Sequence, residues 1–229
     1  MSWVKNTFSS SIGRKFAMAL SALFLMFFLL QHFAINITSV FSAEVFNDLS
    51  HFMGTNPVVQ FALQPILIIA VVYHFVMGFV LEAKNKGARE VKYAMNKGQA
   101  NSTWFSRNMI YSGLVVLAFL ALHFYDFWIP EISTKYIDGD MSGLMANGDF
   151  RYYEEMVEKF HDPLRTGFYV LAFVLLAMHL LHGFQSAFQS IGARHPKYTP
   201  GIKKLGNIFA IAIPAGFIFI ALFHHLTSH

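Results

Sequence analysis

The 229-residue chain contains no cysteine and few charged residues. Without cysteine it cannot form a disulfide framework, hold an iron–sulfur cluster or a thiolate-bound zinc ion, or attach a c-type haem covalently. Charged residues make up 13% of the chain, about half the share typical of a soluble domain, whereas 55% of the residues are hydrophobic. A single water-soluble core could not bury so much apolar surface. Histidine, present 11 times, is the one strong metal ligand that remains.

The hydrophobic residues form five long segments. Each is long enough to cross a hydrocarbon core, which takes about 20 helical residues, and a helix is required because backbone groups in lipid must be satisfied within the segment. The first segment is too long for a cleavable signal peptide and lacks a small-residue cleavage site. We therefore predict an all-α membrane protein, a single domain over residues 1–229, with spans at about 16–40, 58–81, 108–129, 166–190 and 206–226.

The sign of the charges predicts the orientation. The acidic residues, except Glu82 and Glu90, fall in the segments on the side opposite the N-terminus. The positive-inside rule then places the N-terminus inside and the C-terminus outside. This bias either only sets the topology or also provides a basic face for an acidic soluble partner. The basic residues on the inner side are Lys5, Arg14, Lys15, Lys84, Lys86, Arg89, Lys92, Lys97, Arg107, Arg194, Lys197, Lys203 and Lys204.

One long polar stretch, residues 130–165, separates the third and fourth spans and is predicted to be an outer loop. Turn-forming residues occur at 138–140 and 147–149. Residues 150–161 then predict a short amphipathic helix on the outside.

Buried histidines are the candidate functional groups. His32, His74 and His123 lie in the first three spans, and the fourth contains both His179 and His182. An ionisable residue inside a membrane span is costly and usually marks a function. A single one could be a neutral imidazole bonded to a neighbouring helix, but four helices that each present a histidine favour a shared site.

The depth of each histidine predicts an outer pair. His32 follows Lys15 by 17 residues, and His123 follows Arg107 by 16. At a rise of about 1.5 Å per residue, both lie roughly 24–26 Å from the inner charges. They are therefore expected to meet in the outer half of the membrane.

The same reasoning predicts an inner pair. His74 precedes Lys84 by 10 residues, whereas His179 and His182 precede Arg194 by 15 and 12. These distances correspond to roughly 15–23 Å from the inner charges. His74 should therefore pair with His179 or His182. Two imidazoles facing each other at one depth suit the axial ligation of a b-type haem, so two haems are expected.

A glycine follows one turn after a histidine in two spans. His74 precedes Gly78, and His179 precedes Gly183. Residues four apart share a helix face, so each glycine removes a side chain that would collide with a flat macrocycle. This pattern favours His179 over His182, although small residues also serve plain helix packing.

Further motifs together resemble a known family: Ser11-Ile-Gly-Arg-Lys15, Leu30-Gln-His32, Leu122-His123-Phe124, and the segment from Gly183 to Gly192. Over essentially its whole length the chain resembles the cytochrome b membrane-anchor subunit of succinate dehydrogenase and fumarate reductase, in its five-helix, di-haem b558-type form. It departs from that pattern in the long outer segment between the third and fourth spans.

The resemblance implies ligands, partners and a location. His32 and His123 would bind the outer haem iron, and His74 and His179 the inner one. A flavoprotein subunit would interconvert succinate and fumarate, and an iron–sulfur subunit would pass the electrons on. The chain would be the membrane subunit of this enzyme, exchanging electrons with menaquinone in a bacterial cytoplasmic membrane. No nucleic acid is expected as a partner.

Other residues are weaker candidates. Reduction of a quinone needs a proton donor, and Glu44, with Asp48 and His51 nearby, follows the first span; a solvated acidic loop is the alternative. Ser11, Arg14, Gln185 and Ser186 could bind haem propionates or a quinone, or Arg14 could only set topology. We expect His224, His225 and His229 to be interfacial, and we assign no role to His161 or His195.

Two rival interpretations stay open. The chain could be the haem b subunit of another quinone-linked oxidoreductase, such as a hydrogenase, formate dehydrogenase or nitrate reductase. It could instead be a haem-free transporter with a histidine proton relay. A transporter predicts interrupted helices near the midplane, for which only Pro65 and Pro214 are candidates.

Overall fold

The computed structural model describes residues 10–87 and 109–227. Six charged residues used in the topology prediction lie outside the described residues: Lys5, Arg89, Glu90, Lys92, Lys97 and Arg107. His229, expected to be interfacial, lies outside them as well. The side chain of Lys86 is also outside them.

Within these described residues, five helices are long and apolar enough to cross a membrane, which agrees with the predicted number. Three of them are compound, because a 3-10 or π-helical turn joins two regular segments. The five are α2 (Ser11–Asn36) with a 3-10 turn at Ile37–Val40; a π-helical turn at Val59–Leu63 with α4 (Gln64–Gly87); α7 (Met109–His123) with a π-helical turn at Phe124–Trp128 and α8 (Ile129–Tyr136); α10 (Pro163–Ser190); and α11 (Thr199–Thr227).

Local capping residues explain where some of these helices begin and end. The Ser10 side chain accepts a hydrogen bond from the backbone N–H of Gly13 at 3.0 Å, so α2 starts well before the apolar run. Asp162 caps α10 in the same way, and Pro163 occupies the first helical position. Beyond α10, Gly192 adopts a φ of +84°, a conformation that favours glycine and reverses the chain.

The predicted outer loop 130–165 includes helical residues at both edges, and its place outside the membrane stays a prediction. α8 extends the third span to Tyr136, and α10 begins at Pro163. The predicted amphipathic helix is confirmed as α9 (Tyr152–His161). A further helix, α3 (Ala43–Thr55), was not predicted; Ser42 caps it by accepting from the N–H of Val45.

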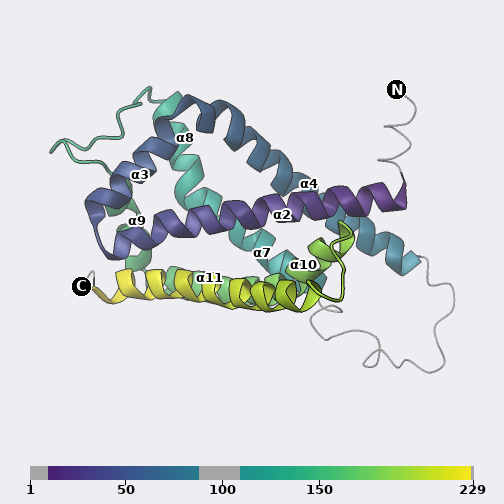
Figure 1. Ribbon diagram of the computed structural model, residues 1–229. Coiled ribbons are helices and arrows are strands. Elements are labelled where there is room, and N and C mark those ends of the chain that lie inside the picture. The colour runs from purple at the N-terminus through teal and green to yellow at the C-terminus, as the bar shows by residue number, and fades with distance from the viewer. Residues whose placement is uncertain (1–9, 88–108, 228–229) are drawn as a thin grey trace.

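Four of the long helices, α2, α4, α7 and α10, surround a common interior (Figure 1). α10 packs against α2 and α7, and α2 packs against α4, whereas α4 and α7 touch each other much less. α11 lies along α10, its main neighbour, and also contacts α2. The start of α2 and the end of α11 lie at opposite ends of the bundle (Figure 1). We call the end where α2 begins the N-terminal end, and the end with α3, α8 and α9 the loop end.

Most apolar side chains of the spans face outward, as expected for lipid contact. No residue in the most apolar stretch of the second span is buried, and Phe27 and Phe61 are more than two-thirds exposed. The tightest packing joins α10 to α11, where Ala210 and Ala221 are fully buried. Small residues allow this close approach, the usual way in which membrane helices associate.

Candidate functional site

The outer pair of histidines meets inside the bundle. His32 comes from the last turns of α2, and His123 from the last residue of α7. Their ring centroids are 5.8 Å apart, and the rings are close to perpendicular, at 83°. The two helices run in the same direction along the bundle, so equal distance from their starts gives equal depth.

The inner pair meets in the same manner nearer the N-terminal end. His74 of α4 and His179 of α10 have ring centroids 6.3 Å apart at an interplanar angle of 71°. His182 does not take part in this pair. Its Nε2 lies 3.0 Å from the hydroxyl of Ser186 on its own helix.

Both separations fit a metal with two axial imidazoles. Two metal–imidazole bonds of about 2 Å each, plus the distance from ring nitrogen to ring centre, put two axial rings roughly 6 Å apart. Within residues 10–87 and 109–227, no three His, Asp or Glu side chains converge to hold a bare ion. A haem brings its own equatorial nitrogens and needs only two more ligands from the protein. The residues present therefore fit haem.

Aromatic rings surround the outer pair. Phe28 stacks on His32 with centroids 5.4 Å apart, and Phe119 stacks on His123 at 5.7 Å. Phe217 of α11 and Phe127 also contact the two rings. The Nδ1 atom of His123 is buried and has no hydrogen-bond partner. Such an apolar wall suits a flat hydrophobic macrocycle.

Serine hydroxyls accompany the inner pair, which the sequence had not suggested. Ser21 Oγ of α2 lies 3.3 Å from His74 Nδ1, and Ser112 Oγ of α7 lies 3.3 Å from His179 Nδ1. Both serines are buried. Their contact with the inner pair could not be predicted along the chain, because each serine contacts a histidine on a different helix.

The two glycines after the inner histidines face neighbouring helices. A Cβ built on Gly78 would lie 3.8 Å from the terminal methyl of Met18, and one on Gly183 would lie 3.7 Å from that of Met109. The space beside each glycine therefore faces the flexible side chain of a methionine, and no backbone atom of another segment lies within 4 Å of the added Cβ.

The predicted propionate or quinone ligands lie at the N-terminal end. Ser11 is exposed in the first turn of α2, and Arg14 is half-buried one turn later. Gln185 donates to the Asn207 side chain of α11 at 3.4 Å.

The predicted proton donor Glu44 is exposed at the loop end. It lies in the first turn of α3 and borders a surface cleft with Asp48, Asp149 and Glu154. His51, one of its predicted neighbours, instead stacks on Phe150 with centroids 4.1 Å apart.

A buried carboxylate near the outer pair was missed. Asp126 lies in the π-helical turn that follows His123 and is 3% exposed. It accepts a hydrogen bond from Tyr169 at 2.8 Å and pairs with Arg165 at 3.5 Å. The signal was present in the sequence, since an aspartate inside a predicted span is itself unusual.

A network of ion pairs ties the loop end together. Glu131 pairs with both Lys135 and Arg151, and Arg151 also pairs with Glu155 at 2.6 Å. Lys135, only 2% exposed, donates to the backbone of Gly54 in α3. These contacts join α3, α8 and α9.

Two ionisable groups of this network have shifted pKa values. Burial of Tyr152, together with the nearby Glu131 carboxylate, raises the pKa of its hydroxyl to about 12. Burial disfavours the charged guanidinium of Arg151, but the hydrogen bond with Glu155 and the charge of Glu131 outweigh it and raise the pKa of Arg151.

Two histidines of α11 lie at the loop end and do not join either pair. His224 is 1% exposed, and its Nε2 lies 2.9 Å from the Ser39 hydroxyl. His225 Nδ1 lies 2.8 Å from the carbonyl oxygen of Phe160. Both therefore contact neighbouring segments at the loop end, where His224 is buried, and their interfacial position stays a prediction.

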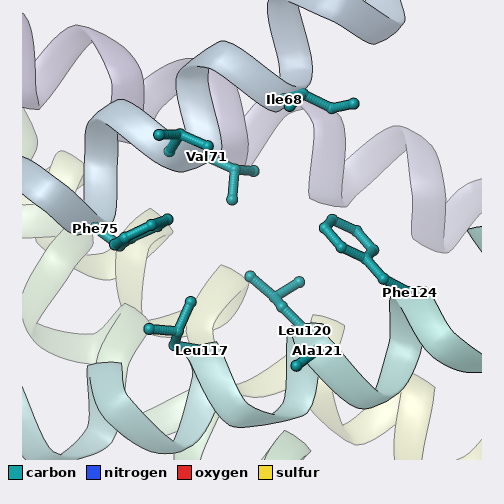
Figure 2. A pocket seen from close by; sticks show the side chains of 8 residues that line it. Ile68, Val71, Phe75, Leu117, Leu120, Ala121 and Phe124 are labelled. Atoms are coloured by element: carbon teal, nitrogen blue, oxygen red, sulfur yellow. The ribbon is translucent and has the colours of Figure 1, made fainter.

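The weak contact between α4 and α7 leaves an apolar cavity of about 210 Å³ (Figure 2). Phe75 and Phe124, which follow His74 and His123 in sequence, stand at its two ends (Figure 2). The remaining lining residues are Ile68, Val71, Val72, Leu117, Leu120 and Ala121. The cavity offers no polar side chain, so it suits only an apolar group.

Comparison with known proteins gives one relative that spans the bundle. The chain is 25% identical over 198 residues, 85% of each chain, to the succinate dehydrogenase cytochrome b558 subunit of Bacillus subtilis. No protein-family profile matches the chain, and no solved structure matches it. The similarity covers most of the length of both chains. The chain is a distant homologue of this cytochrome b558 subunit.

Proposed function

We propose that the chain is the di-haem cytochrome b subunit of a succinate:quinone oxidoreductase, a succinate dehydrogenase or fumarate reductase. The observation that most supports this proposal is that the bundle holds two separate histidine pairs. Each has a ring separation suited to one haem, at 5.8 and 6.3 Å, inside a chain homologous to a cytochrome b558 subunit.

His32 and His123 would hold the outer haem, and His74 and His179 the inner one. Each haem supplies a one-electron carrier when bound. The chain's own part is to orient the four imidazoles on separate helices and to exclude water with the aromatic rings around them.

The partners follow from the proposed complex. A flavoprotein and an iron–sulfur subunit would dock at the N-terminal end, which faces the cytoplasm of a bacterial cell. The basic residues between α10 and α11, Arg194 and Lys197, lie at that end and are exposed. Menaquinone would exchange electrons at the loop end with Glu44 as a proton donor, and Ser11 and Arg14 would contact a propionate of the inner haem.

The test is a reduced-minus-oxidised spectrum with haem quantitation on the purified complex. Alanine replaces His32, His74, His123 or His179 in turn. Wild type should hold two b haems per chain, and each variant should lose one, because an axial ligand is gone. His182→Ala is the matched control and should keep both haems, since His182 bonds to Ser186 and not to the inner pair.

The outcomes separate the rival interpretations. Absence of haem from the wild-type protein would contradict the proposal and favour a histidine relay in a transporter. Two haems in a complex with a catalytic subunit other than a succinate- or fumarate-converting flavoprotein would assign the chain to another quinone-linked oxidoreductase.

A further inference from the structure

The two serines at the inner histidine pair have a defined hydrogen-bond direction. Ser21 Oγ lies 2.7 Å from the carbonyl oxygen of Met18, and Ser112 Oγ lies 2.9 Å from that of Met109. A hydroxyl has a single proton to donate, and a carbonyl can only accept. Each serine proton therefore goes to its own helix backbone, and an oxygen lone pair faces the histidine.

This direction sets the tautomer of the inner histidines. Since Ser21 Oγ and Ser112 Oγ accept, Nδ1 of His74 and Nδ1 of His179 must carry the proton and donate it. A neutral imidazole has one protonated nitrogen. The lone pair is therefore on Nε2 of both rings, where it is free to bind a metal.

The arrangement occurs twice in the chain. In α2, Met18 precedes Ser21 by three residues and Ser21 precedes His32 by eleven; Met109, Ser112 and His123 repeat both spacings in α7. The contacts repeat as well, because Met18 faces Gly78, and Met109 faces Gly183. Local packing around one side chain does not explain why the same arrangement of methionine, serine and histidine recurs on two separate helices.

The outer pair lacks such acceptors. The buried Nδ1 of His123 has no hydrogen-bond partner. His32 Nδ1 lies 3.4 Å from the Asn36 side-chain amide nitrogen, which is a donor. The serine acceptors therefore distinguish the inner pair from the outer one.

We propose that Ser21 and Ser112 are positioning residues that hold His74 and His179 in the tautomer presenting Nε2 to the inner haem iron. This inference rests on the proposed function, in which that pair binds haem. A hydrogen bond donated from the far ring nitrogen also raises the basicity of a ligating imidazole. A more basic ligand favours ferric over ferrous iron, so the serines should lower the midpoint potential of the inner haem.

The test is a redox titration of haem absorbance in the membrane-bound complex. Ser21→Ala and Ser112→Ala should each raise the midpoint potential of one haem and leave the other unchanged, and the double variant should raise it further. Loss of a hydrogen bond to a ligating histidine typically costs about 10–100-fold in metal affinity or activity. A tenfold loss of preference for ferric iron would equal an upward shift of about 59 mV. Ser21→Thr and Ser112→Thr keep the hydroxyl and should return the potential toward the wild-type value.

Ser39→Ala is the matched control, because it removes a buried serine from His224, which belongs to neither pair. It should leave both potentials unchanged. Loss of the inner haem in the alanine variants, restored in the threonine variants, would also support the inference. Unchanged midpoint potentials in Ser21→Ala and Ser112→Ala would overturn the inference. An equal shift of both haem potentials in these variants, or the same shift in Ser39→Ala, would also overturn it. Those results leave the proposed function standing, whereas a wild-type chain without haem would overturn that function itself.

Discussion

At the scale of single residues, the bundle separates histidines that face each other from histidines that bond elsewhere. His179 contributes to the inner pair, whereas His182, three residues later, bonds to Ser186. Both lie in the same helix, α10. Their difference comes from the direction in which each side chain leaves α10, since a helix of 3.6 residues per turn turns two positions three apart by about 60° relative to each other.

Glu44 provides a residue-scale prediction for quinone chemistry. Glu44→Gln keeps the size and removes the proton donor, so it should lower quinone-linked turnover by about a hundredfold or more, the range of general acid catalysis, while both haems remain. The measurement is succinate-dependent reduction of a menaquinone analogue by the purified complex. Glu154→Gln, in the same surface cleft, is the control and should keep normal turnover. Normal turnover in Glu44→Gln would remove this residue from the quinone site.

The buried bond between Tyr169 and Asp126 predicts a loss of stability when it is removed. Tyr169→Phe deletes a hydroxyl that donates to a buried carboxylate at 2.8 Å. A hydrogen bond to a charged group contributes about 1.5–3 kcal/mol, and the free energy of unfolding in detergent should fall by that amount. Tyr125→Phe, at an exposed position next to Asp126, should have almost no effect. Equal stability of the two variants would contradict this reading.

At the scale of elements, the fifth helix depends on small residues. A Cβ on Gly216 of α11 would collide with the aromatic ring of Phe33 on α2. Gly216→Ala should therefore push the two helices apart and cost about 1–3 kcal/mol of unfolding free energy, the usual effect of overpacking. Thermal unfolding in detergent measures it.

Gly167→Ala is the control for this variant. Gly167 lies in α10, and a Cβ there meets nothing within 4 Å. Alanine has the higher helix propensity, so this variant should be as stable as wild type or more so. If Gly216→Ala were equally harmless, α2 and α11 would not be in firm contact at this point.

The ion-pair network of α3, α8 and α9 predicts a dependence of stability on alkaline pH. The pKa of Tyr152 is raised from 10.0 to about 12 in the folded protein. A raised pKa means that Tyr152 stabilises the fold fully below pH 10 and that this contribution is lost as pH rises toward about 12. In Tyr152→Phe, the fall in melting temperature between these pH values should be smaller than in wild type. An identical fall in both would show that Tyr152 is not buried beside Glu131.

At the scale of the whole molecule, the five long helices of the described residues put the start of α2 and the end of α11 at opposite ends of the bundle (Figure 1). Because the chain has no cysteine, single cysteines can report the orientation directly. Ala146→Cys at the loop end should react with a membrane-impermeant maleimide in intact cells. Lys197→Cys, between α10 and α11, should react only after the membrane is opened. The reverse pattern would invert the proposed topology.

The sequence alone predicted the five spans and the depth of the histidines. Both depend on local properties, which are the length of an apolar run and the fixed rise of a helix. The same local properties brought His32 to His123 and His74 to His179, because equal depth on neighbouring helices leaves few alternatives. The helix boundaries were predicted less accurately. α8 and the early start of α10 follow from Pro130, Asp162 and Pro163, which favour the start of a helix. The polar composition of 130–165 obscured this signal.

Only the tertiary structure decided which polar groups meet across helices. Ser21 reaches His74, Ser112 reaches His179, and Tyr169 reaches Asp126. Each contact depends on how far a helix is rotated about its own axis and on the angle at which it crosses its neighbour. These angles come from side-chain packing, and a span that is apolar on all sides gives no hydrophobic stripe from which to predict its rotation. The depth of a residue could therefore be counted along the chain, but its partner could not.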